Sequence, residues 1–204
     1  FNILKSSKIN FSLLKKHFGF VGNNYLINAV GQTKNHLDKI IVLPIIGFEL
    51  LGNYALALQT YVMLMIFSKI IYNYTLPRDS IGETTTKVKI IALISSVIIT
   101  LFGVTATPFI IPVIFPEYTE AVIAIQIISL AVIPSTITLI LSSKFLGGEN
   151  SKIVLTGRIA SAIIIISLIV ILTPIYGISG TTGSFVIASI AQAVILFVYY
   201  RLRN

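Results

Sequence analysis

Apolar segments alternate with short polar stretches along the chain, and five of them are long enough to cross a membrane as helices. These five segments cover residues 51–76, 90–111, 121–146, 153–173 and 178–200. About 20 helical residues cross the hydrocarbon core of a bilayer. A sixth segment, 11–46, has the length but carries a polar middle. The pattern predicts an all-α fold, a polytopic membrane bundle of six transmembrane helices, in which residues 1–204 form a single transmembrane domain.

Composition indicates that lipid is the solvent for this fold. The mean hydropathy is +0.95 and only 11% of the residues are charged, which is unusual for a soluble domain. Cysteine is absent, and neither His17 nor His36 has a second ligand at metal-binding spacing. We therefore expect neither a metal site nor a bound cofactor.

The basic residues fall on one side of the predicted membrane. If six spans start from the cytoplasm, thirteen of the fifteen Lys and Arg residues lie at cytoplasmic ends or loops. These are Lys5, Lys8, Lys15, Lys16, Lys69, Arg78, Lys87, Lys89, Lys144, Lys152, Arg158, Arg201 and Arg203. The opposite connections contain Glu49, Glu117 and Glu120 but no Lys or Arg. By the positive-inside rule this predicts a cell-membrane protein with both ends of the segment in the cytoplasm.

The same topology accounts for the formal net charge of +8. Basic residues that are scattered over short loops orient the helices and contact anionic headgroups, so membrane lipids are expected partners. A nucleic-acid partner is not expected, because nucleic-acid binding calls for basic residues gathered on one face.

The polar middle of the first segment has a helical spacing. Asn24, Asn28, Gln32, Asn35 and Lys39 follow one another at intervals of four, four, three and four residues. At about 100° per residue they share an arc of roughly 80° on one helix face. A rise of about 1.5 Å per residue puts this face between the middle of the bilayer and its outer surface. Polar groups at that depth usually mark a path for something polar.

Two charged residues flank this polar stripe. Lys34 lies one turn before Asp38 and can pair with it. A solvated loop, or amides that join neighbouring helices, would also explain the polar residues. We favour a water-filled lumen because the residues share one helix face.

Motifs that belong to common enzyme classes are missing. The chain has no GxSxG, HExxH, P-loop or DxD sequence, and no two acids pair at helical spacing within one span. We therefore do not expect an enzyme. The chain begins at Phe1 without a cleavable signal, and we interpret it as a piece of a longer protein.

Three blocks of sequence resemble a family of exporters. They are LDKIIVLPIIGFELLGNYALALQ at 37–59, FPEYTEAVIAIQIISLAVIP at 115–134 and LTPIYGISGTTGSFVIA at 172–188. The first has an Asp near the end of a span and a Gly-x-Tyr that opens the next helix. Together the blocks are similar to the C-terminal half of polysaccharide biosynthesis proteins of the O-antigen flippase type. These proteins belong to the multidrug/oligosaccharidyl-lipid/polysaccharide exporter superfamily.

The resemblance implies two six-helix bundles that face each other across a central cavity. This chain would be the second bundle, and the N-terminal half of the same protein would be its partner. Such proteins move a polyprenyl-pyrophosphate-linked oligosaccharide from the inner to the outer leaflet by alternating access. Asp38 matches the Asp of the family in this span, and Lys39 matches its basic neighbour.

These considerations predict a substrate-binding role for the stripe and its neighbours. The predicted contacts to the glycan or its water are Asn24, Asn28, Gln32 and Asn35. Amides suit this role because they replace the hydrogen bonds that sugar hydroxyls lose on leaving water. Lys34 and Lys39 are expected to meet the anionic head, and Asp38 to tune those cations or to couple an ion.

Other functions share some of these features. A drug or metabolite antiporter of the same superfamily would need a coupling acid deep in a span, whereas Asp38 lies near an end. A membrane glycan polymerase or ligase would show a large outer loop with Arg, His or acidic clusters, and the predicted outer loops are short. A helical scaffold without transport activity would not need a polar stripe.

Overall fold

The computed structural model of the protein describes residues 11–203, with side chains at all of these positions except 11–17, 32–40, 46 and 49. Every regular element in the described part of the chain is a helix, which confirms the predicted all-α class. In chain order the elements are α1 (Phe11–Leu64), α2 (Ile66–Ser80), α3 (Thr86–Ile114), the short 3₁₀ helix η1 (Pro116–Tyr118), α4 (Ala121–Ser129), α5 (Val132–Gly147) and α6 (Ser151–Arg203).

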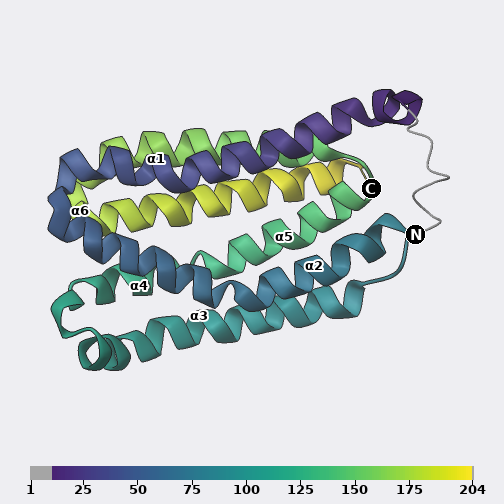
Figure 1. Ribbon diagram of the computed structural model, residues 1–204. Helices are drawn as coiled ribbons and strands as arrows, with labels where there is room; N and C mark the ends of the chain where they lie inside the picture. Colours follow the sequence, from purple (N-terminus) through teal and green to yellow (C-terminus); the bar gives the residue numbers. More distant parts are fainter. Residues whose placement is uncertain (1–10, 204) are drawn as a thin grey trace, which may run out of the picture.

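Two glycines turn the long helices α1 and α6 back on themselves. Gly47 has φ 77° and Gly177 has φ 55°, both in the left-handed region that disfavours a side chain. No atom would lie within 4 Å of a Cβ at either position, so the backbone angle, not crowding, requires glycine. Each helix is therefore a hairpin of two arms (Figure 1). The arms are residues 11–46 and 48–64 in α1, and 151–176 and 178–203 in α6.

Hydroxyl contacts hold the two arms of α6 together along their length. Near the turn, the hydroxyls of Thr173 and Thr181 lie 3.0 Å apart. Farther along, Ser161 Oγ donates a hydrogen bond to the Ala188 carbonyl at 3.1 Å. Short side chains of this kind let helix backbones approach closely, which is how helices associate in lipid.

Three helices are long and apolar enough to cross a membrane within residues 11–203. They are Thr86–Ile114, Ala121–Gly147 and Ser151–Arg203. A fourth span results if Leu50–Leu64 and Ile66–Ser80, which meet at a bend of 45°, count as one. This supports a multi-pass membrane protein. The predicted count of six crossings stays a prediction, because it requires each arm of α6 and the polar first arm of α1 to cross separately.

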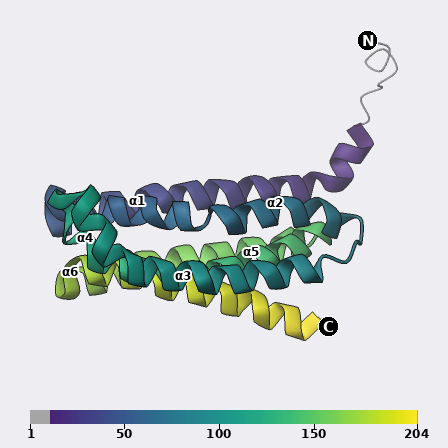
Figure 2. The same ribbon diagram turned by 90° about the horizontal axis from the view of Figure 1, so that it is seen from below.

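The helices run side by side along one axis, and their connections gather at two opposite ends (Figure 1, Figure 2). One end holds the start of α1, the α2–α3 and α5–α6 connections and the last turn of α6. We call it the basic end, because its described cations are Arg78, Lys87, Lys89, Lys144, Lys152, Arg201 and Arg203. The other end, with Gly47, Gly177 and the segment 115–120, carries Glu117 and Glu120. The connections with basic residues thus lie at one end of the bundle and those with Glu117 and Glu120 at the other, as the charge pattern predicted.

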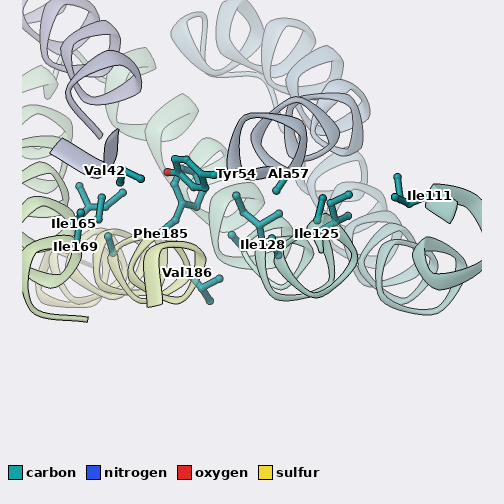
Figure 3. Packing of buried hydrophobic residues seen from close by; sticks show 14 residues of the cluster. Val42, Tyr54, Ala57, Ile111, Ile125, Ile128, Ile165, Ile169, Phe185 and Val186 are labelled. Carbon is teal, nitrogen blue, oxygen red and sulfur yellow. The ribbon is translucent and has the colours of Figure 1, made fainter. Parts of the chain in front are cut away.

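The largest apolar core lies where the second arm of α1 crosses α4 and α6. Figure 3 shows Tyr54 of α1, Ile125 and Ile128 of α4, and Ile165 and Phe185 of α6 within this cluster. A smaller cluster nearer the basic end joins α1, α5 and α6. Its buried residues are Ile27, Leu141, Phe145, Val154 and Leu196.

Helix α3 has small polar residues inside and large apolar residues outside. Its buried face includes Ser96, Thr100 and Gly103, and a Cβ at Gly103 would lie only 2.5 Å from Ser129 Oγ. On its outer face Ile98 is 60% exposed and Leu101 is 59% exposed. This distribution is the reverse of that in a water-soluble helix, and it suits a helix whose outer face contacts lipid.

Candidate functional site

The stretch that carries the polar stripe is helical, so the alternative of a solvated loop does not hold. Residues 23–39 lie inside the first arm of α1 without a break. Asn24 Nδ2 donates to the Phe20 carbonyl of the same helix at 2.9 Å, and the Asn28 side chain is exposed. Asn23 Nδ2 donates to Ser151 Oγ of α6 at 3.2 Å, so this amide joins two helices.

The remaining predicted site residues cannot be placed by their side chains. Gln32, Lys34, Asn35, Asp38 and Lys39 belong to α1, but their side chains lie outside the described residues. Their proposed roles with glycan, anionic head and coupling ion stay predictions. Of the predicted set, only the side chains of Asn24 and Asn28 are described, and neither forms a hydrogen bond to a described residue of another helix.

A charge that the sequence analysis assigned to the membrane boundary lies inside the bundle. Arg158 is on the first arm of α6, seven residues after its start at Ser151, which corresponds to about 10 Å of helix. Its Nε is buried and has no hydrogen-bond partner, and no described carboxylate forms an ion pair with it. A buried nitrogen donor without a partner is costly.

Glycine 31 of α1 makes the space that this guanidinium occupies. A Cβ at Gly31 would lie 3.0 Å from one terminal nitrogen of Arg158 and 3.5 Å from its Cζ. Gly31 stands three residues after Asn28 on the arm that carries the polar stripe. The guanidinium therefore lies directly against the helix that carries the polar stripe.

Four polar residues of neighbouring helices lie near this level of the bundle. The hydroxyls of Tyr61 and Tyr72 are close enough to Arg158 to interact with its charge. Tyr61 Oη donates to Ser135 Oγ at 2.7 Å. Thr138 Oγ1 of α5 is buried and has no partner.

The packing of the smaller core places Thr138 at this level too. Ile27, Leu141 and Val154 belong to that cluster, and Gly31, Thr138 and Arg158 each lie about one turn farther from the basic end on the same three helices. The Arg158 site, defined as Arg158, Gly31, Tyr61, Tyr72, Ser135 and Thr138, thus combines a cation with two buried atoms that lack partners. Such an arrangement offers hydrogen-bond donors to an anion or to water.

A second row of polar residues faces outward from α1 and α2. Gln59, Lys69 and Asn73 are all exposed, although their helices otherwise present large apolar side chains on that side. Lys69 and Asn73 are four residues apart, so they share one face of α2. Lys69 forms no ion pair among the described residues. Polar side chains that point away from their own bundle are suited to a water-filled space beside it.

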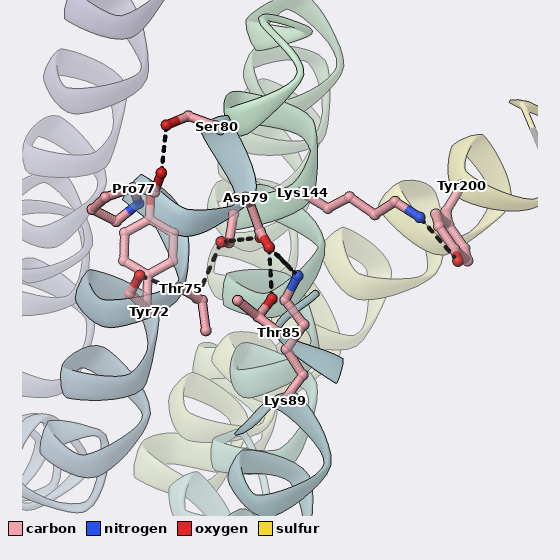
Figure 4. Close-up of polar contacts among 10 residues, drawn as sticks. Tyr72, Thr75, Pro77, Asp79, Ser80, Thr85, Lys89, Lys144 and Tyr200 are labelled. Carbon is pink, nitrogen blue, oxygen red and sulfur yellow. Dashed lines mark hydrogen bonds and ion pairs between the residues drawn. The ribbon is translucent and has the colours of Figure 1, made fainter. Parts of the chain in front are cut away.

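Another buried charge, Asp79 at the end of α2, has every partner it needs (Figure 4). Its Oδ1 accepts from Thr85 Oγ1 at 2.6 Å and from Lys89 Nζ at 2.8 Å. Its Oδ2 accepts from Lys89 Nζ at 2.7 Å and from Ser143 Oγ at 2.5 Å. Ser143 Oγ also lies 3.1 Å from Thr75 Oγ1. We call these residues the Asp79 network; it joins α2, α3 and α5 at the basic end and serves the fold.

Sequence reasoning missed both buried charges, although each left a signal. Arg158 falls five residues inside the predicted span 153–173, which marks it as a charge at membrane depth. Asp79 comes ten residues before Lys89, a separation that only the α2–α3 turn brings to contact distance. Among the side chains that the structure describes, no three from His, Cys, Asp or Glu come together as metal ligands.

Comparison with protein-family models, with curated proteins and with solved structures found no match to this chain. The arguments for its function therefore rest on its residues and their arrangement.

Proposed function

We propose that this chain forms one wall of a transport path for a lipid-linked oligosaccharide whose head carries phosphate or pyrophosphate. In this proposal the two arms of α6 and the first arm of α1 each cross the membrane, which gives six crossings. The basic end faces the cytoplasm, as the positive-inside rule requires for its cluster of Lys and Arg. The N-terminal half of the same protein forms the opposite wall of the path.

The observation that carries the proposal is the buried Nε of Arg158, which has no hydrogen-bond partner, on a cation that no described carboxylate pairs with. Arginine is the side chain best suited to phosphate, because its planar fork binds two oxygens at once. A buried Nε without a partner lowers stability unless a ligand or water completes its hydrogen bonds. A passing phosphate would do so at Arg158, and the exposed amide of Asn28 lies on the adjacent part of α1.

An oligosaccharide cargo gives the exposed polar residues a role. Sugar hydroxyls lose several kcal/mol each when they leave water without replacement partners. Asn28, Gln59 and Asn73 present amides to the space beside the bundle, and Lys69 adds a cation. The predicted contacts of Gln32, Asn35, Lys34 and Lys39 would extend the same path toward the outer surface.

The antiporter alternative finds less support. A coupling acid must release its proton or ion during the transport cycle, so it needs lone pairs that are free to exchange partners. Asp79 is committed to Lys89, Thr85 and Ser143. The same superfamily fold would serve both functions, and the cargo distinguishes them.

The test is complementation of a strain whose surface polysaccharide depends on the full-length protein. Arg158→Gln should stop polysaccharide export and cause the lipid-linked precursor to accumulate, while Arg158→Lys retains part of the activity. Lys87→Gln is the matched control, because Lys87 is an exposed cation near the start of α3 and lies outside the Arg158 site. Export at the level of the unaltered protein in Arg158→Gln cells that contain normal amounts of the protein would contradict the proposal.

A second pair of substitutions tests the polar path itself. Replacing Asn28 and Gln32 together by Leu should leave membrane insertion intact, because both changes make the segment more apolar. Export should be lost in the same complementation assay. Unchanged export would show that this face of α1 does not line the path.

A further inference from the structure

Four cations converge where the end of α5 meets both ends of α6. Lys144 lies in the last turn of α5 and Lys152 in the first turn of α6. Arg201 and Arg203 lie in the last turn of α6. All four side chains are exposed. Because α6 is a hairpin, its first and last turns meet at the basic end, and we call this region the α5–α6 corner.

Neutral groups hold these cations in position. Lys144 Nζ donates to Tyr200 Oη at 3.2 Å and lies 4.3 Å from the centre of the Tyr200 ring (Figure 4). Arg203 donates to Asn150 Oδ1 at 2.5 Å. These contacts fix the positions of the charges without neutralising them.

The neighbouring α2–α3 corner at the same end is different. There Arg78 pairs with Glu83 at 3.3 Å, and Lys89 pairs with Asp79 at 2.7 Å. No described carboxylate forms an ion pair with any of the four cations at the α5–α6 corner. The α5–α6 corner has four cations and one described acid, Glu149, whereas Arg78, Lys87 and Lys89 at the α2–α3 corner accompany two acids, Asp79 and Glu83. The α5–α6 corner is therefore the more positive of the two, and its excess positive charge is available to an anion.

Apolar and aromatic side chains adjoin the same corner on the outer face of α6. Leu202 is 79% exposed, and Phe197 and Tyr199 are also exposed. The guanidinium of Arg201 lies 5.6 Å from the centre of the Phe197 ring. Exposed aromatic rings beside cations are typical of the membrane interface, where acyl chains and headgroups meet. The start of α6 adds the positive end of a helix dipole.

We propose that the α5–α6 corner binds the headgroup of an anionic phospholipid, with the phosphate between Lys144 and Arg203 and the acyl chains along the outer face of α6. The apolar surface beside the cations favours a lipid over a soluble phosphate. The proposal requires only that the protein is in a membrane, so it does not depend on the transported cargo. The bound lipid tethers α5 to both arms of α6 at the membrane surface.

The test measures binding of fluorescent phosphatidylglycerol, and of phosphatidylcholine with the same acyl chains, to the purified full-length protein in detergent. We expect phosphatidylglycerol to bind more tightly. The double variant Lys144→Gln with Arg203→Gln should bind phosphatidylglycerol about 25-fold more weakly, from a loss of about fivefold for each cation at a membrane surface. Binding of phosphatidylcholine should not change.

Two control variants test whether the loss of binding is due to charge, and whether it is specific to the α5–α6 corner. Lys144→Arg with Arg203→Lys retains both charges and should keep phosphatidylglycerol binding. Arg78→Gln removes a cation from the other corner and should leave binding unchanged. The proposal is overturned if the double Gln variant binds phosphatidylglycerol as the unaltered protein does. It is also overturned if inorganic phosphate displaces the lipid at equal concentration, because the site would then recognise a soluble anion.

Discussion

The carboxylate of Asp79 and the guanidinium of Arg158 are both charges inside the same helix bundle, but their surroundings differ in every respect. Asp79 receives hydrogen bonds on both oxygens and pairs with Lys89. Arg158 has a buried nitrogen without a partner and forms no ion pair with a described carboxylate. A saturated charge holds neighbouring elements together, whereas an unsaturated one is retained at a cost to stability. The difference assigns Asp79 to the fold, and it is why we propose that Arg158 binds the phosphate of a passing substrate.

The largest effect on stability should come from removing the carboxylate of Asp79. Asp79→Ala leaves Lys89 without its carboxylate and removes the tie between α2, α3 and α5. We expect a loss of about 3 kcal/mol in the free energy of unfolding, as for other buried ion pairs. Thermal unfolding of the purified protein in detergent measures it. Glu83→Ala is the control: it breaks the exposed pair with Arg78, which should cost about 0–1 kcal/mol.

Removing the charge of Arg158 should have the opposite effect on stability and should abolish transport. Arg158→Met keeps an unbranched apolar side chain and deletes a cation that no described carboxylate neutralises. The free energy of unfolding should stay the same or rise by about 1 kcal/mol, because the desolvation cost disappears. Polysaccharide export should nevertheless be lost in the complementation assay. A clear fall in thermal stability would mean that Arg158 serves the fold as Asp79 does.

A smaller effect is expected at the tyrosine beside Arg158. Tyr61→Phe removes the hydroxyl that donates to Ser135 and keeps the ring, which packs edge-on against Phe185 at 4.9 Å between centres. Loss of one neutral hydrogen bond should cost about 1 kcal/mol of stability. Thermal unfolding of Tyr61→Phe beside Ser135→Ala measures this, and similar losses for the two variants would assign the cost to their shared bond.

The smallest change tests the space beside the guanidinium. Gly31→Ala puts a methyl group 3.0 Å from a terminal nitrogen of Arg158, so the guanidinium must shift by a few tenths of an ångström. We expect export to fall about threefold, as a small misplacement of a binding group commonly costs. Gly22→Ala on the same arm is the matched control, because no atom lies within 4 Å of its Cβ. Equal export by the two variants would show that the position of Arg158 is not important.

Local patterns in the sequence predicted the helices and the separation of charges between the two ends. The spacing of Asn24 and Asn28 indicated a helix because helical periodicity is a property of one segment. Neither the Arg158 site nor the Asp79 network could be derived in this way. Gly31 and Arg158 meet only through the packing of α1 against α6, and Ser143 reaches Asp79 only through the packing of α5 against α2. The charge of Arg158 inside an apolar segment was visible, but its surroundings were not.

The single-residue reversals at Gly47 and Gly177 have a consequence for mapping the topology of the protein. Neither turn adds a loop. A protease, antibody or labelling reagent that approaches the end with Glu117 and Glu120 therefore meets mainly the exposed segment 115–120 between α3 and α4. An epitope inserted beside Glu117 should be accepted and detected. The same insertion at Gly47 or Gly177 would separate two helix arms that are joined by one residue with a left-handed backbone.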